Sequence, residues 1–298
     1  SDSPVPIDYV IPFKTEAISS VILFERYLSE ALLTWNYSGM WHDPVERESY
    51  SFAGFSDPFG KSAMVIGFDD FRDAVYTLDV DMGDKQINSI TAKCDREGIK
   101  LQPGEKLKIS DLVIRHANSL TESLKEYGWI VVENMGRSEK EVMDGWCSWY
   151  YYYGTLTYND LTSNMKAIHD LGLADVVDVI QIDAGWYNLT KEKELIEWKI
   201  RGDWLNDYGF KFPMGMKKVA DEIKAQGFVP GIWTAPFLGD PLSDIFQEHP
   251  DYFVHRNGRQ SLRLDLSDPK VLKRIEKVFK KLANEDGYEY FKIDFLGA

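Results

Sequence analysis

The stretch Tyr290-Phe291-Lys292-Ile293-Asp294-Phe295-Leu296-Gly297-Ala298 closes the chain and has the pattern of a short buried strand. Apolar residues alternate with Lys292 and Asp294, so both polar side chains are expected on one face of that strand. A cation beside a carboxylate favours the ionised carboxylate at neutral pH. The stretch therefore predicts a strand that presents a positioned carboxylate, which can serve as a nucleophile, a base or a ligand.

Three further apolar runs upstream have the same strand character and alternate with helical patterns. The predicted strands are residues 145–151, 177–183, 229–235 and 289–295. A helix is expected after Thr157, which can form a capping box with Asp160. Its apolar stripe is Leu161, Met165, Ile168 and Leu171. Two more helices are expected, one from about residue 213 to Gly227 and one from Asp268-Pro269 to Gly287.

This alternation predicts parallel strands joined by helical crossovers. No Gly-rich dinucleotide fingerprint follows any of the strands, which disfavours a Rossmann domain. Polar residues at the carboxyl ends of the strands favour a (β/α)₈ TIM barrel instead. Residues 141–298 are therefore predicted to form the first half of such a barrel, about four βα units, truncated after strand 4.

Residues 1–140 have a different character. Short β-type runs at 20–27, 62–68, 74–80, 87–92 and 107–114 are separated by turn residues, and an amphipathic helix is expected at 119–127. The pattern predicts an N-terminal antiparallel β-sandwich, and no catalytic constellation is evident in it. The predicted fold class is thus an antiparallel β-sandwich followed by a partial α/β barrel.

Composition excludes several classes of function. The net charge is −14, from 34 basic and 48 acidic residues, which disfavours nucleic acid as a partner. No apolar run approaches the roughly 18–20 residues that span a bilayer, so no membrane partner is expected. The two Cys and five His residues lack metal-ligand spacing, so neither a metal nor a cofactor is predicted. The start has no signal pattern, which predicts a cytoplasmic location.

Candidate site residues are the polar and aromatic residues at the carboxyl ends of the predicted strands, where parallel α/β folds gather their active sites. They are Trp149, Tyr150, Asp183, Trp233, Lys292 and Asp294. Each has a structural alternative. The aromatic residues could be packing, and the Lys-x-Asp pair could be a structural ion pair. A charge at the lip of a buried strand is costly unless it is paired, which favours a functional role for Asp183.

Asp203 and Trp204 lie on a long loop after the second strand. A loop carboxylate is usually just solvated, but the adjacent Trp raises the chance that Asp203 faces a cleft. Carboxylates and aromatic residues without a metal or nucleotide signature fit glycoside hydrolysis, which uses one carboxylate as nucleophile or base and another as acid.

Several segments, in order, carry a resemblance to a known family. They are Gly145-Trp146-Cys147-Ser148-Trp149-Tyr150, Gln181-Ile182-Asp183, Gly202-Asp203-Trp204, Gly231-Ile232-Trp233-Thr234-Ala235-Pro236-Phe237, His249-Pro250-Asp251, Leu264-Asp265-Leu266-Ser267 and Phe291-Lys292-Ile293-Asp294-Phe295-Leu296. This ordered set resembles glycoside hydrolase family 36, the α-galactosidases or melibiases, over about residues 144–298.

The resemblance implies a retaining enzyme that hydrolyses terminal α-galactosyl residues of oligosaccharides, with Asp294 as nucleophile. Lys292 corresponds to a Lys that binds sugar hydroxyls, and Trp149, Trp204 and Trp233 to aromatic residues of the galactose pocket. Asp183 corresponds to the first of two adjacent Asp residues that hold the galactose 4- and 6-hydroxyls.

This sequence departs from the family pattern at the second of those Asp positions, which is Ala184. The family's acid/base comes from a later barrel strand, so the chain alone is expected to be inactive or nearly so. Asp203 is a tempting substitute, supported only by its place near the expected cleft.

Two other functions remain open. One is a non-catalytic sugar-binding or scaffold fragment that another chain completes. The other is a galactosyltransferase like the raffinose synthases, which share the Gly-Trp-Cys-x-Trp segment and the Lys-x-Asp motif. An uncovered edge of a parallel sheet also predicts association with a second copy or with a complementary C-terminal half.

Overall fold

The computed structural model describes residues 3–18, 24–31, 37–42, 44–84, 86–138, 142–187, 200–205, 209–256 and 258–296. The chain forms two compact units, residues 1–140 and 141–298, and each is described by itself. Within the described residues, no helix combines the length and apolar character needed to cross a membrane.

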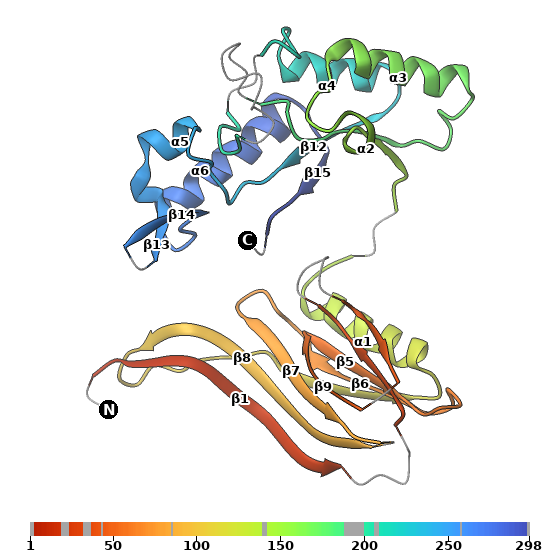
Figure 1. Ribbon diagram of the computed structural model, residues 1–298, viewed down its shortest axis with the longest axis vertical. Coiled ribbons are helices and arrows are strands. Elements are labelled where there is room, and N and C mark those ends of the chain that lie inside the picture. The colour runs from red at the N-terminus through yellow and green to blue at the C-terminus, as the bar shows by residue number, and fades with distance from the viewer. Residues whose placement is uncertain are drawn as a thin grey trace. The chain divides into compact units, whose positions relative to one another are not determined.

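The N-terminal unit contains two antiparallel sheets (Figure 1). One has the order β1 (Val5–Ile18), β8 (Ile87–Leu101), β7 (Val75–Met82) and β4 (Val45–Tyr50). The other has the order β3 (Gly39–Trp41), β2 (Arg26–Ser29), β5 (Phe52–Ser56), β6 (Ala63–Phe68) and β9 (Leu112–Ala117). Buried side chains from both sheets, among them Phe55, Phe68, Leu78 and Ile90, form one hydrophobic cluster. The two sheets therefore share a core.

Helix α1 (Leu120–Asn134) packs against the second sheet and begins where the sequence predicts. Ser119 is its N-cap and accepts a hydrogen bond from the backbone N–H of Glu122 at 3.2 Å. The Tyr127 hydroxyl donates to the carbonyl oxygen of Phe68 at 2.6 Å, and the Ser123 hydroxyl to that of Ala63 at 3.2 Å. These two bonds anchor the helix to both ends of β6.

The sequence-based strands of this unit are only partly correct. Strands β6 and β7 confirm the predicted runs to within two residues. The run 20–27 lies partly outside the described residues, and β2 begins only at Arg26. The run 107–114 is wrong over its first five residues, because β9 begins at Leu112. Strands β1, β3, β4 and β5 were not predicted. β4 is a sheet edge rich in polar residues, so its apolar pattern is weak.

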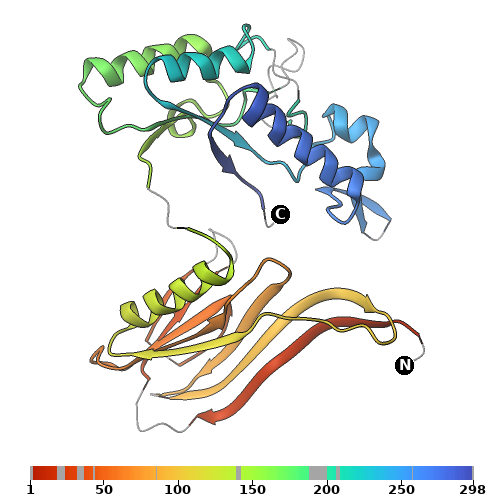
Figure 2. The ribbon, with the colours of Figure 1, turned by 180° about the vertical axis from the view of Figure 1, so that it is seen from behind.

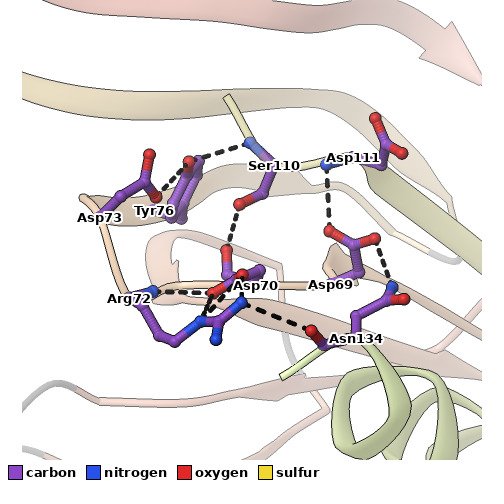
Figure 3. A network of polar contacts seen from close by, with 8 residues as sticks. All are labelled: Asp69, Asp70, Arg72, Asp73, Tyr76, Ser110, Asp111 and Asn134. Atoms are coloured by element: carbon purple, nitrogen blue, oxygen red, sulfur yellow. Dashed lines mark hydrogen bonds and ion pairs between the residues drawn. The ribbon is translucent and has the colours of Figure 1, made fainter. Parts of the chain in front are cut away.

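A polar network ties the β6–β7 connection to the start of β9 and the end of α1 (Figure 3). The Arg72 guanidinium pairs with the Asp70 carboxylate and, more weakly, donates to the carbonyl oxygen of Asn134 at 3.4 Å. The Asp69 carboxylate accepts from the backbone N–H of Asp111 at 3.0 Å and from the Asn134 amide at 2.6 Å. The hydrogen bonds from Arg72 lower the pKa of Asp70 to about 2.

The C-terminal unit is built on a parallel sheet in sequence order. Its strands are β10 (Gly145–Cys147), β11 (Val179–Ile182), β12 (Val229–Thr234) and β15 (Tyr290–Ile293). Helix α3 (Tyr158–Asp170) connects β10 to β11, α4 (Met216–Ala225) connects β11 to β12, and α6 (Pro269–Lys280) precedes β15. Helices α3 and α4 lie side by side over the sheet (Figures 1 and 2).

The apolar stripe of α3 is confirmed except at its end. Leu161, Met165 and Ile168 are buried in one cluster with the sheet and α4. Leu171 is the C-cap residue and is 72% exposed, so its place in the stripe was wrong. The capping box of Thr157 and Asp160 is present as predicted, because it depends only on neighbouring residues.

A small subdomain follows β12. It consists of α5 (Asp244–Glu248), a 3₁₀ turn (Pro250–Tyr252) and the hairpin of β13 (Phe253–Arg256) and β14 (Arg259–Leu264). Ile245, Phe253 and Leu264 form a separate hydrophobic cluster with Val271 at the start of α6. This hairpin was not predicted from the sequence.

The first predicted strand of this unit is too long. β10 ends at Cys147, and the aromatic run continues as a helical turn, α2 (Trp149–Tyr152). The backbone N–H of Tyr152 donates to the carbonyl oxygen of Ser148 at 3.0 Å, which closes that turn. The chain thus leaves the sheet at Ser148, and the aromatic side chains no longer alternate between two faces.

Candidate active site

A pocket of about 480 Å³ lies at the carboxyl ends of the parallel strands. Its lining comes from the ends of β11, β12 and β15, from α2 and from two loops. The lining residues are Trp149, Asp183, Ala184, Arg201, Trp233, Asp240, Lys292, Asp294 and Phe295. The topology of the parallel sheet thus brings together residues from widely separated parts of the chain.

Asp294 immediately follows β15 and enters the pocket. Its backbone N–H donates to the carbonyl oxygen of Thr234 at 2.9 Å, which extends the pairing of β15 with β12. One carboxylate oxygen, Oδ2, accepts from the Trp233 indole N–H at 3.1 Å. The other, Oδ1, accepts from the backbone N–H of Phe295 at 2.8 Å. Phe295 has a φ of 55°, an uncommon conformation for an aromatic residue and one often found near functional sites.

The two charged residues of the Lys-x-Asp motif do not form the ion pair that was the structural alternative for them. The Lys292 ammonium lies 2.8 Å from Oδ2 of Asp183, so its partner is the Asp of β11 rather than Asp294. Burial opposes the charge on Lys292, but the hydrogen bond and attraction from Asp183 outweigh burial and raise its pKa. Lys292 therefore stays protonated and cross-links the ends of two strands that are separated by β12.

Asp183 is only 3% exposed and is heavily hydrogen-bonded. Its Oδ2 accepts from the Gln181 amide at 3.1 Å and from the Cys147 thiol at 3.5 Å, and its Oδ1 from the N–H of Ala184 at 2.8 Å. Burial raises the pKa of Cys147, so this thiol is a protonated donor at neutral pH. The costly buried charge expected at this strand end is thus fully paired.

Arg201 and Asp240 are pocket residues that the sequence analysis missed. The guanidinium donates through Nε to Asp240 Oδ2 at 2.8 Å and through Nη2 to Asp240 Oδ1 at 2.9 Å. It also lies over the Phe295 ring, with its central carbon 4.8 Å from the ring centre. The hydrogen bonds with Asp240 raise the pKa of Arg201 despite its burial. The only available signal was weak, an Arg directly before the Gly202-Asp203-Trp204 motif.

The predicted aromatic residues separate into two groups. Trp149 and Trp233 line the pocket. Trp204 is 2% exposed and packs edge-on against Trp233 and Tyr187, with ring centres 5.8 and 4.5 Å away, behind the pocket lining. Tyr150 is 83% exposed and does not belong to the lining. Trp204 thus supports the wall that Trp233 presents.

Asp203 also lies outside the pocket lining. Its carboxylate accepts from the backbone N–H groups of Asp244 and Ile245, at 2.8 and 3.1 Å, and is 2% exposed. A carboxylate is favourable at a helix N-terminus, where backbone N–H groups lack partners. Asp203 therefore holds the start of α5 in place, with both oxygens engaged, which does not suit a general acid.

Across the part of the chain that the structure describes, no group of three or more His, Cys, Asp or Glu side chains is placed to hold a metal ion. The pocket instead combines carboxylates, two cations and two indole rings, which suits a sugar with hydroxyls on its edge and C–H groups on its faces.

The chain also matches a known family model. The melibiase family model matches residues 123–296, which is more than half of the chain. The chain belongs to the melibiase family. This confirms the resemblance to glycoside hydrolase family 36 seen in the ordered motifs.

Several α-galactosidases are similar in sequence. Alpha-galactosidase Mel36A of Lactobacillus acidophilus is 23% identical over 210 residues, which cover 65% of this chain and 27% of that protein. An alpha-galactosidase of Escherichia coli is 32% identical over 119 residues, or 38% of this chain and 16% of that protein. The aligned part of this melibiase-family chain is therefore only a fraction of the length of these relatives.

Solved structures show the same fold over nearly the whole chain. TtGalA, an alpha-galactosidase from Thermus thermophilus solved with stachyose, has a TM-score of 0.68 at 18% identity, covering 98% of this chain and 61% of that one. The GH36 alpha-galactosidase AgaA from Geobacillus stearothermophilus has a TM-score of 0.71 at 15% identity, covering 96% and 42%. At this level of identity the likeness concerns the fold alone.

Proposed function

We propose that this chain carries the sandwich domain and the first four βα units of a retaining α-galactosidase, with Asp294 as the nucleophile. The two antiparallel sheets with a shared core support the sandwich, and the parallel sheet in sequence order supports the partial barrel. The names of the family relatives support an α-galactoside as the substrate.

The observation that carries the proposal is the state of the Asp294 carboxylate. It lines the pocket at the carboxyl end of a parallel strand. Each of its oxygens accepts one hydrogen bond, from Trp233 and from the Phe295 backbone, so spare lone pairs remain. Neither donor is a cation, so the carboxylate is oriented without being neutralised by an ion pair. An oriented carboxylate with a spare lone pair is what attack on an anomeric carbon requires.

In the proposed reaction an Asp294 oxygen forms an ester bond to the anomeric carbon while the bond to the leaving oxygen breaks. The leaving oxygen takes a proton from a general acid. A water molecule then attacks the anomeric carbon, gives a proton to the group that acted as the acid and releases the Asp294 carboxylate, so the configuration is retained. The indole N–H of Trp233 keeps Asp294 in place during attack. Transfer to a sugar acceptor, as in the raffinose synthases, would use the same ester.

The other lining residues would bind the sugar. The Lys292 ammonium, fixed by Asp183, can donate to ring hydroxyls, and the rings of Trp149 and Trp233 can cover the apolar face of the pyranose. We propose that the general acid comes from a further segment or from a complementary chain, because the other carboxylates of the described lining, Asp183 and Asp240, are held by cations.

The test uses a fluorinated α-galactosyl fluoride, whose fluoride leaves with little help from an acid. The expected result is a stable ester on Asp294, detected as a mass increase and located by peptide mapping. Asp294→Asn should remove the label. Asp221→Asn, which changes an exposed carboxylate of α4, should label like the wild type. Labelling of another residue, or undiminished labelling of Asp294→Asn, would refute the assignment.

A further inference from the structure

The hydrogen-bond capacity of the pocket is unevenly distributed between donors and acceptors. A carboxylate has about four lone-pair sites. At Asp183, Oδ2 accepts from Lys292, Gln181 and Cys147, and Oδ1 accepts from the N–H of Ala184, so one lone pair of Oδ1 remains. A carboxylate in this state has little capacity left to accept a hydrogen bond from a substrate hydroxyl.

Asp240 is similarly engaged. It accepts three hydrogen bonds from Arg201, from the backbone N–H at 2.6 Å and from Nε and Nη2 of the side chain. Asp294 keeps spare lone pairs, but the proposed reaction uses them for attack. Within the described lining, the pocket therefore offers a substrate few free acceptors.

Free donors are more plentiful. The Lys292 ammonium has three N–H groups, and one is used by Asp183. Arg201 has five, and its side chain uses only Nε and one N–H of Nη2. The described residues take up no N–H of Nη1. The outer edge of the guanidinium, formed by Nη1 and Nη2, is thus left for a ligand, while Asp240 and the Phe295 ring hold its plane in place.

Ala184 adds an apolar wall next to Asp183. It is 5% exposed, its N–H is bonded to Asp183, and its methyl group offers no acceptor. Arg201, Asp183 and Ala184 all line the same pocket, so the guanidinium and the apolar wall belong to one cavity.

We propose that this pocket selects an α-galactoside whose exocyclic carbon carries an anionic group, a carboxylate or a sulfate ester, and that Arg201 binds that group. The proposal rests on the proposed function, because it names the substrate class of the same pocket. A hydroxyl both donates and accepts, so a neutral sugar needs acceptors from the pocket for its own O–H groups, and the described lining offers few. An anion only accepts, and a planar guanidinium edge can bind two of its oxygens at once.

The experiment is calorimetric titration of the whole chain with three probes, since binding does not require the general acid. The probes are methyl α-D-galactoside, methyl α-D-galacturonide and methyl α-D-galactoside sulfated at the exocyclic hydroxyl. We expect at least one anionic probe to bind about 10- to 100-fold more tightly than the neutral one. The two anionic probes separate a carboxylate ligand from a sulfate ligand. Equal or tighter binding of the neutral sugar would overturn the proposal.

Variants test the role of Arg201. Arg201→Met should abolish the preference for the anion, and Ala184→Asp, which adds a carboxylate acceptor, should shift it toward the neutral sugar. Arg201→Lys keeps the charge opposite Asp240 and decides the matter if Arg201→Met does not fold. It should lose about 10-fold of the preference, because an ammonium lacks the planar edge. Lys217→Met, which removes an exposed cation of α4, is the control.

The outcomes separate this inference from the proposed function. Labelling of Asp294 together with a preference for the neutral sugar overturns the inference alone. A preference for the anion that persists in Arg201→Met and in Arg201→Lys overturns the role of Arg201. Absence of both labelling and binding of every probe overturns the proposed function.

Discussion

Each unit of the molecule contains an Arg–Asp pair beside a pocket, and the two pairs behave differently. Arg72 and Asp70 of the N-terminal unit have side chains that are 54% and 25% exposed (Figure 3). Arg201 and Asp240 of the C-terminal unit are 21% and 13% exposed and lie beside an aromatic ring. The residue types are the same, but the second pair is largely removed from water.

The difference shows what makes a polar cluster useful for binding. Solvent screens the first pair, and water can replace each of its hydrogen bonds, so the network mainly joins loops. Charges removed from water interact more strongly, and an unmatched donor in such a place is costly. A complementary ligand is therefore expected to bind more tightly in the C-terminal pocket than in the N-terminal pocket.

The largest effect on stability is expected from Gly185→Ala in the loop after β11. Gly185 has a φ of 102°, and a Cβ there would lie 2.5 Å from the carbonyl oxygen of Gly154. Because backbone must move, the variant should lose about 3 kcal/mol of unfolding free energy. Urea denaturation followed by tryptophan fluorescence measures this loss.

Gly104→Ala in the N-terminal unit is the matched control for that variant. Gly104 also has a positive φ, 80°, but a Cβ there would meet nothing within 4 Å. It should cost only about 1 kcal/mol, the strain of the backbone conformation. Equal losses in the two variants would show that the close approach around the pocket has no energetic consequence.

A smaller loss is expected from Lys292→Met. It leaves the buried Asp183 carboxylate without its cation, although three other donors remain. We expect a loss of about 2 kcal/mol, which Asp183→Asn in the same chain should partly reverse. Arg72→Met breaks the more exposed pair of the other unit and should lower the urea midpoint less than Lys292→Met does. Equal urea midpoints for Lys292→Met and Arg72→Met would contradict the expected difference between the buried pair and the exposed pair.

The smallest effect is a pH dependence in the N-terminal unit. The pKa of Asp70 is lowered to about 2 by its hydrogen bonds with Arg72. Because the folded-state pKa lies below the unfolded value, this pair stabilises the unit above about pH 4. The contribution declines as the pH falls through that value toward 2. NMR titration of the Asp70 carboxyl carbon should show the low midpoint, and Arg72→Ala should return it toward 4. An unchanged titration midpoint of Asp70 in Arg72→Ala would mean that another group lowers its pKa.

The accuracy of the sequence-based predictions depended on how far apart the interacting residues are. The capping box of Thr157 and Asp160 was predictable, since it involves residues three positions apart. The carboxyl ends of parallel strands were predictable from apolar runs followed by polar residues. Edge strands such as β4 were missed, because their polar residues face solvent and blur the alternation.

The sequence predicted which residues belong to the candidate site better than it predicted which of them contact one another. Asp183, Lys292 and Asp294 do meet in one pocket, as their positions at strand ends suggested. The contact of Lys292 with Asp183 could not be predicted, because the spacing of two residues within one strand gives no information about a side chain two strands away. Asp203 lies two residues after the pocket residue Arg201, yet it stabilises the start of α5.

The sequence by itself determined the order of the parallel strands, the helices between them, the family and the residues at the strand ends. These features rest on local hydrogen bonds and on apolar periodicity, which a single segment contains. Only the tertiary structure decided that Lys292 pairs with Asp183, 109 residues away, and that Arg201 pairs with Asp240, 39 residues away. Such pairs form between separate elements, so their geometry is set by how those elements pack.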